Sequence, residues 1–95
     1  MTTSVSTRER YFTAIVHAAD GVRFVASSPS ARALAAQVVG YVRERCDDVL
    51  WPSVAAEVHA LIESQKLEAA IATYFANVGQ RWDVEQLELG GVVGA

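Results

Sequence analysis

Residues 11–28 read YFTAIVHAADGVRFVASS, and this stretch decides the fold class of the chain. Two runs rich in β-branched and aromatic residues flank Asp20-Gly21. Asp-Gly between such runs is a strong signal for a β-hairpin with a two-residue type I′ turn. Most of the remaining sequence has helical periodicity, so we predict an α+β fold in which helices pack on a small antiparallel sheet.

Both faces of the predicted hairpin are largely apolar. With Asp20 and Gly21 as the turn, Ile15 lies opposite Ala26 and His17 lies opposite Phe24. The other face carries Phe12, Ala14, Val16, Ala18, Arg23 and Val25. A sheet with one face in water normally alternates apolar and polar residues. We therefore expect that either both faces are covered or one face is an interface.

Three helices are predicted after the hairpin. Ser28-Pro29 begins the first, because serine is a favourable N-cap and proline fits the first helical position. This helix should end near Asp47-Asp48, since the helix dipole disfavours anions at the C-terminus. Trp51-Pro52 begins a second helix. Its apolar stripe changes direction around residues 64–66, which predicts a break, and Gly79 ends the third helix.

The segment 81–89 is predicted to be a third strand that pairs antiparallel with the first. Trp82 and Val84 alternate, whereas Leu87 and Leu89 are out of phase with them. Either a strand with a bulge or a short strand followed by an irregular arm accounts for this pattern. The predicted order is β-β-α-α-α-β, with two to three helices and the first strand at the centre of a three-stranded sheet.

The length and composition indicate one domain. Residues 1–9 are expected to be a disordered N-terminal arm, 10–89 the α+β domain and 90–95 a flexible C-terminal tail. The single cysteine cannot form an internal disulfide, and no apolar run is long enough to span a membrane. We therefore expect a soluble cytoplasmic protein that does not bind a membrane.

Charge and motifs exclude several classes of function. The net charge is -3, and the arginines are scattered rather than clustered, so nucleic-acid binding is not expected. The sequence has no phosphate-binding or dinucleotide-binding glycine loop, and no HExxH, CxxC or GxSxG motif. Zinc binding through His17, Cys46 and His59 has no support from their spacing. We predict no catalytic residues, no metal and no cofactor.

The candidate ligand-binding residues are His17, Phe24, Arg45 and Tyr74. Arg45 lies within the apolar arc of the first helix, where it either covers the last carbonyls of the helix or binds a carboxylate or another anion. Glu85 and Glu88, in contrast, are interpreted as a charged edge on the last strand.

The candidate interface residues lie on the back of the first helix and at two element boundaries. Small side chains on the helix permit close approach of another element, and the tryptophans stand beside the start of a helix or strand. These residues are Ala33, Ala36, Gly40, Trp51 and Trp82.

Two hypotheses for the function follow. The first is a non-catalytic protein–protein interaction module, which would be a homo-oligomer, an accessory subunit or a regulatory partner. The second is a small-molecule-binding protein or small enzyme with a pocket between sheet and helices near His17. Convergence of the four ligand-binding candidates on one cavity would distinguish the second hypothesis from the first.

Overall fold

The computed structural model describes residues 10–80 and 84–93 of the chain. The elements are β1 (Arg10–Ala18), β2 (Gly21–Ser28), α1 (Ala31–Val49), α2 (Pro52–Glu63), α3 (Leu67–Asn77), the short 3₁₀ helix η2 (Val78–Gln80) and β3 (Glu85–Val93). The predicted α+β class and the order β-β-α-α-α-β are confirmed.

The sheet is antiparallel with the strand order β2-β1-β3, which places β1 at the centre as expected. β3 pairs with β1 in continuous register from Ala18–Glu85 to Arg10–Val93. The strand is therefore regular, without the bulge, and it continues four residues past the domain boundary expected at 89. Leu87 and Leu89 are both inside this strand, whereas Val84 precedes it and Trp82 lies outside the described residues. Val84 therefore does not have to alternate in phase with the two leucines.

The hairpin is confirmed, but its register differs by one residue from the expected one. Ala19 and Asp20 form the turn, and Gly21 is already the first residue of β2, paired with Ala18. Among the described residues only Gly21 (φ 125°) and Gln65 have a positive φ, so the turn is not type I′. The glycine is needed one position later than predicted, where the second strand begins.

A β-bulge follows the turn. Val16 pairs with Phe24 and His17 pairs with Val22, which leaves Arg23 as the extra residue on β2. Phe24 therefore shares a face with Val16, and the expected pairing of His17 with Phe24 is wrong. The reason is geometric, because a shift of one residue moves every side chain of a strand to the opposite face.

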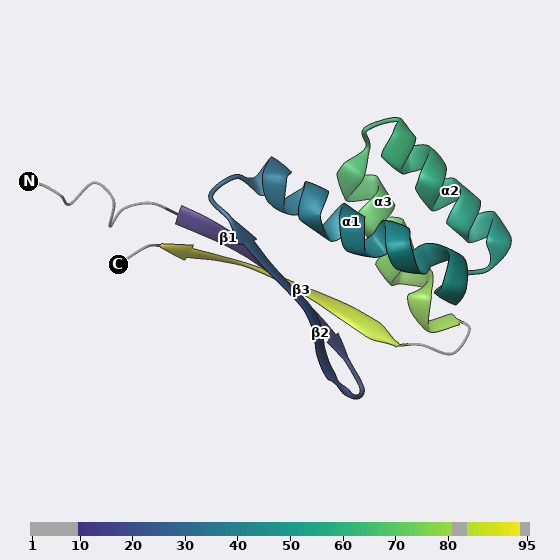
Figure 1. The fold of residues 1–95 in the computed structure, drawn as a ribbon, viewed down its shortest axis with the longest axis horizontal. Helices are drawn as coiled ribbons and strands as arrows, with labels where there is room; N and C mark the ends of the chain where they lie inside the picture. Colours follow the sequence, from purple (N-terminus) through teal and green to yellow (C-terminus); the bar gives the residue numbers. More distant parts are fainter. Residues whose placement is uncertain (1–9, 81–83, 94–95) are drawn as a thin grey trace, which may run out of the picture.

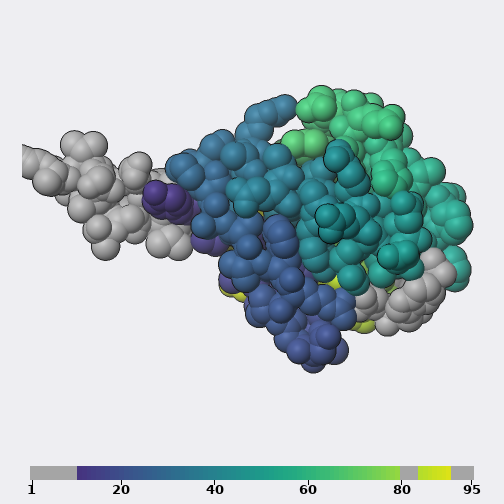
Figure 2. All heavy atoms as spheres, viewed as in Figure 1, coloured from purple at the N-terminus to yellow at the C-terminus, as the bar shows by residue number. Residues whose placement is uncertain are grey.

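All three helices lie on one side of the sheet (Figure 1). α1 packs on β1 and β2, α3 packs beside β3, and α2 contacts α1 and α3. In the space-filling view, α1 and the hairpin form one continuous surface, beneath which β3 is visible only in small patches (Figure 2). The other face of the sheet has no helix of the described chain upon it.

The helix boundaries follow local hydrogen bonding. Ser30 rather than Ser28 is the N-cap of α1, and its Oγ accepts a hydrogen bond from the N–H of Ala33 at 3.2 Å. Ser28 Oγ accepts from the N–H of Ser30 at 3.1 Å, so the helix begins two residues later than expected. The predicted break between α2 and α3 is confirmed, with Gln65 at φ 63°.

The core lies between the inner sheet face and the helices. The predicted stripe of α1 is buried along its whole length: Leu34, Val38, Val42, Cys46 and Val49. Ala14, Val16 and Ala26 meet it from the sheet, and Val58, Ile62 and Tyr74 from the other two helices.

Within the described residues, no helix is both long enough and apolar enough to cross a membrane.

Two glycines give opposite predictions for stability. Gly21→Ala should lower the free energy of unfolding by about 1 kcal/mol or more, because a Cβ is strained at this φ. Gly40→Ala should raise it by about 0.5–1 kcal/mol, because Gly40 lies within α1 and a Cβ there meets nothing within 4 Å. Urea denaturation of both variants tests this, and the same sign for both would contradict the assignment.

Candidate functional site

The most unusual residue of the interior is Glu85, whose side chain is fully buried on the inner face of β3. It shares this face with Leu87 and Leu89, because side chains two residues apart in a strand point to the same side. The interpretation of Glu85 as an edge charge is therefore wrong. Glu88 points to the opposite face and is exposed, as an edge charge should be.

Four side chains neutralise and hydrogen-bond this carboxylate. Arg23 Nη1 and Arg45 Nη2 lie 2.8 and 2.9 Å from Oε2. Tyr41 donates its hydroxyl to Oε2 and Tyr74 donates to Oε1, both at 2.7 Å. A buried carboxylate is tolerated only when its oxygens are satisfied in this way. We call these five residues the Glu85 network.

Each partner comes from a different position in the fold. Tyr41 and Arg45 are four residues apart on α1 and thus share one helical face, while Tyr74 comes from α3. Arg23 is the bulged residue of β2, and it reaches Glu85 across Ala18 of the central strand. The Arg23 Nε also lies 3.4 Å from Asp20, so the cluster holds two positive and two negative charges.

Aromatic rings surround the network. The ring centroids of Phe24 and Tyr41 are 5.0 Å apart, those of Tyr41 and Tyr74 6.4 Å, and those of Tyr74 and Phe75 4.8 Å. Burial and the hydrogen bonds to the Glu85 carboxylate raise the pKa of both tyrosines well above 10. Both hydroxyls therefore remain protonated donors at neutral pH.

The structure brings together three of the four ligand-binding candidates. Phe24, Arg45 and Tyr74 all belong to the surroundings of Glu85. Arg45 pairs with the carboxylate of Glu85 inside the domain, which is neither of the two roles considered for it, and its binding of an external anion stays a prediction. His17 lies on the opposite sheet face, where its Nε2 is 2.7 Å from Glu88 Oε1.

Two hollows of the surface are lined by other residues than Phe24, Arg45 and Tyr74. A shallow hollow beside His17 is lined by Ala18, Ala19, Val84 and Gln86. An apolar groove of about 360 Å³ runs between α1, α3 and β3 beside Leu34, Ile71 and Leu89. Neither hollow combines His17 with the other three candidates.

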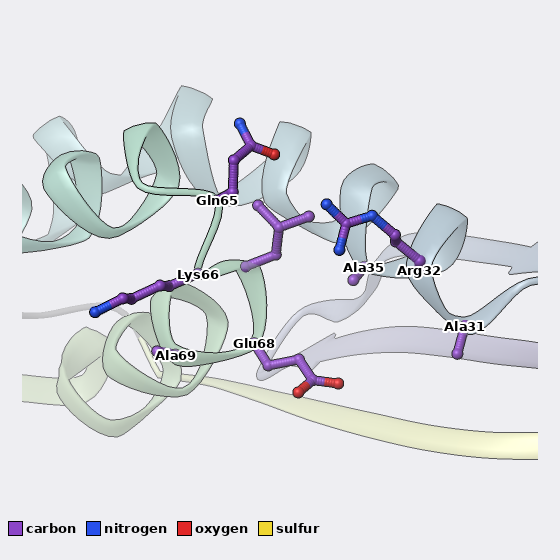
Figure 3. A pocket seen from close by; sticks show the side chains of 8 residues that line it. Ala31, Arg32, Ala35, Gln65, Lys66, Glu68 and Ala69 are labelled. Atoms are coloured by element: carbon purple, nitrogen blue, oxygen red, sulfur yellow. The ribbon is translucent and has the colours of Figure 1, made fainter.

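A larger hollow of about 530 Å³ lies between the first turns of α1 and α3. Figure 3 shows that Arg32 projects from α1 toward α3, whereas Lys66 extends away from Arg32. Glu68 extends from α3 on the side of the hollow opposite Gln65. The two cations do not converge on a common point, so this hollow is not arranged to bind one anion.

A second polar cluster joins the end of α1 to α2. His59 Nε2 lies 3.2 Å from Cys46 Sγ and 3.2 Å from Asp47 Oδ1. Burial and the nearby Asp47 charge raise the pKa of the Cys46 thiol, which is therefore a neutral thiol in this environment. The sequence analysis considered Cys46 and His59 together only with His17, which lies on the opposite sheet face, and it did not consider Asp47 as their partner.

The interface candidates are largely at the surface. Ala33, Ala36 and Gly40 are exposed on α1, and no described element lies against the Gly40 backbone where a Cβ would project. Trp51 is 49% exposed rather than a core residue. Trp82 lies outside the described residues.

Comparisons with protein-family models, with curated proteins and with solved structures found no match to this chain.

Glu85→Gln should lower the free energy of unfolding by about 2–4 kcal/mol, because two arginines would remain partly buried without their counter-charge. Glu88→Gln is the matched control on the same strand, and its exposed carboxylate should contribute less than about 1 kcal/mol. Urea denaturation measures both. Equal losses would show that the Glu85 network does not stabilise the fold.

The raised pKa values of Tyr41 and Tyr74 predict loss of stability at alkaline pH. The unfolded chain releases these protons near pH 10, whereas the folded protein retains them, so the unfolding free energy falls as pH rises above 10. The slope should approach about 2.7 kcal/mol per pH unit for the two groups together. The double variant Tyr41→Phe, Tyr74→Phe should be less stable at neutral pH but have a flatter pH dependence. An unchanged slope would contradict the proposed burial of both hydroxyls.

Proposed function

We propose that this protein is a non-catalytic interaction module that pairs with a second copy of itself through the sheet face that the helices leave uncovered. We call this surface the outer sheet face. Its described side chains are Tyr11, Thr13, Ile15 and His17 of β1, Val22, Val25 and Ser27 of β2, and Gln86 and Glu88 of β3.

The observation that carries the proposal is the group of exposed apolar side chains on the β1 and β2 part of this face. Val22 and Val25 are 57% and 64% exposed, and Tyr11 is 38% exposed. Ile15 pairs directly with Val25, so an aliphatic row crosses the two strands. A solvated sheet face normally carries polar side chains at such positions. Contiguous exposed apolar side chains with a polar rim are typical of interaction surfaces.

The charges of the outer sheet face favour a second copy. Glu88 is the one acidic side chain among its described residues, and His17 lies beside it at 2.7 Å. Two such faces can therefore approach without strong repulsion. Two such faces that meet about a two-fold axis form an isologous contact.

The size of the face predicts a weak dimer. Three strands of about nine residues cover roughly 14 by 30 Å, or about 420 Å², at ordinary strand spacings. This footprint is smaller than the roughly 800 Å² per partner of a typical stable interface, so the dimer should dissociate readily on dilution. Both oxygens of the Glu85 carboxylate are occupied by side chains of the domain itself, which favours a structural role for the Glu85 network.

Val25→Glu should convert the protein to a monomer, because the new charge would be buried at the centre of the contact. Light scattering at a series of protein concentrations should show the wild-type mass rising from 10.2 kDa toward twice that value, while the variant stays at the lower mass. Ala60→Glu on the exposed surface of α2 is the control and should dimerise normally.

Two results would overturn the proposal. A wild-type protein that stays monomeric at every concentration would exclude self-association. A dimer that survives Val25→Glu but is lost in Gly40→Leu would place the interface on α1 instead of the outer sheet face. Circular dichroism of each variant confirms that the fold is retained.

A further inference from the structure

We propose that Cys46, Asp47 and His59 form a zinc-binding site at the junction of α1 and α2. One potential ligand atom of each residue, the thiol sulfur, a carboxylate oxygen and an imidazole nitrogen, lies within 4.8 Å of the other two. These are three of the ligand types that zinc prefers. The proposal is independent of the outer sheet face, which is on the other side of the sheet from the helices.

The separations of His59 Nε2 from the other two ligand groups are close to those of tetrahedral coordination, and the thiol sulfur and the carboxylate lie within 4.8 Å of each other. Zinc binds sulfur at about 2.3 Å and nitrogen or oxygen at about 2.0–2.1 Å, which places S and N about 3.6 Å apart and N and O about 3.3 Å apart at tetrahedral angles. Sγ of Cys46 is 3.2 Å from Nε2 of His59, and Nε2 is 3.2 and 3.3 Å from the two oxygens of Asp47. Small side-chain movements would therefore admit the metal.

The Cys46 thiol also donates to the carbonyl oxygen of Arg43 at 3.7 Å, so hydrogen bonding accounts for part of this cluster. The same nitrogen of His59 faces both the thiol and the carboxylate, and a single N–H cannot point well at two partners in different directions. A metal ion would accept a lone pair from all three atoms at once. On binding, the thiol proton is released to solvent and the thiolate bonds to zinc.

The position at the end of α1 favours a cation. Asp47 and Asp48 stand in the last turn, where the helix dipole is negative, and this turn contains no basic residue. A divalent ion would offset the charge of Asp47 and that of the new thiolate.

The three residues differ in burial, and this difference determines which side of the metal would face solvent. Cys46 is buried, whereas the side chains of His59 and Asp47 are 35% and 69% exposed. The metal would thus be held from the protein side, with its fourth position directed to solvent. Three protein ligands and one exchangeable position form the arrangement of zinc sites that bind water or a further ligand.

Cobalt provides a direct test on the untagged, reduced protein. Cys46 is the single cysteine of the chain, so a Co²⁺–thiolate charge-transfer band identifies it as a ligand. We expect this band together with the intense visible absorption of four-coordinate cobalt, and we expect Zn²⁺ to displace the cobalt at one ion per chain. Absence of the thiolate band would overturn the proposal.

Matched variants separate a defined site from general attraction of cations. Asp47→Asn and His59→Gln should each weaken Zn²⁺ binding at least tenfold in calorimetric titrations. Asp48→Asn, which removes the neighbouring exposed charge, and His17→Gln, which removes the other histidine, should change the affinity less than twofold. Equal effects of Asp47→Asn and Asp48→Asn would contradict a specific site. Because the substituted side chains are partly or largely exposed, circular dichroism should show that all four variants fold.

Discussion

The carboxylate of Glu85 constrains the arrangement of the whole domain, because a buried negative charge must be paired wherever the chain places it. Glu85 itself belongs to β3, and its two carboxylate oxygens receive hydrogen bonds or ion pairs from residues of β2, α1 and α3. All three strands, α1 and α3 therefore contribute to, or lie against, one polar cluster. These directional contacts restrict the position of α1 on the sheet.

The cluster also explains irregularities in the sequence. Arg45 stands in the apolar arc of α1 because its partner lies in the core beneath it. The bulge at Arg23 and the small side chain of Ala18 allow a residue on one edge strand to reach Glu85 on the other. Two arginines face the buried Glu85 carboxylate, and the exposed carboxylate of Asp20 lies 3.4 Å from one of them, Arg23. Replacement of one member leaves its partners buried and unsatisfied.

Surfaces outside this cluster are available for contacts with other molecules. The helices cover one face of the sheet, and the aliphatic row of Ile15 and Val25 lies on the other (Figure 1). The end of α1 presents Cys46 and Asp47 to His59 on the next helix. These two regions lie on different sides of the domain, so binding at one does not occupy the other.

The sequence by itself determined the features that depend on neighbouring residues. The hairpin, the break near Gln65 and the buried stripe of α1 are readable because turn chemistry and side-chain periodicity act over a few residues. Only the tertiary structure decided that Glu85 is buried and that His59 meets Cys46. The two-residue periodicity of a strand does place Glu85 on the same face as Leu87. Together with the charge of Arg45 in the apolar arc of α1, this periodicity could have predicted a buried ion pair. The one-residue register of the hairpin, and the docking of distant elements, depend instead on packing energies summed over the whole domain, which no local segment contains.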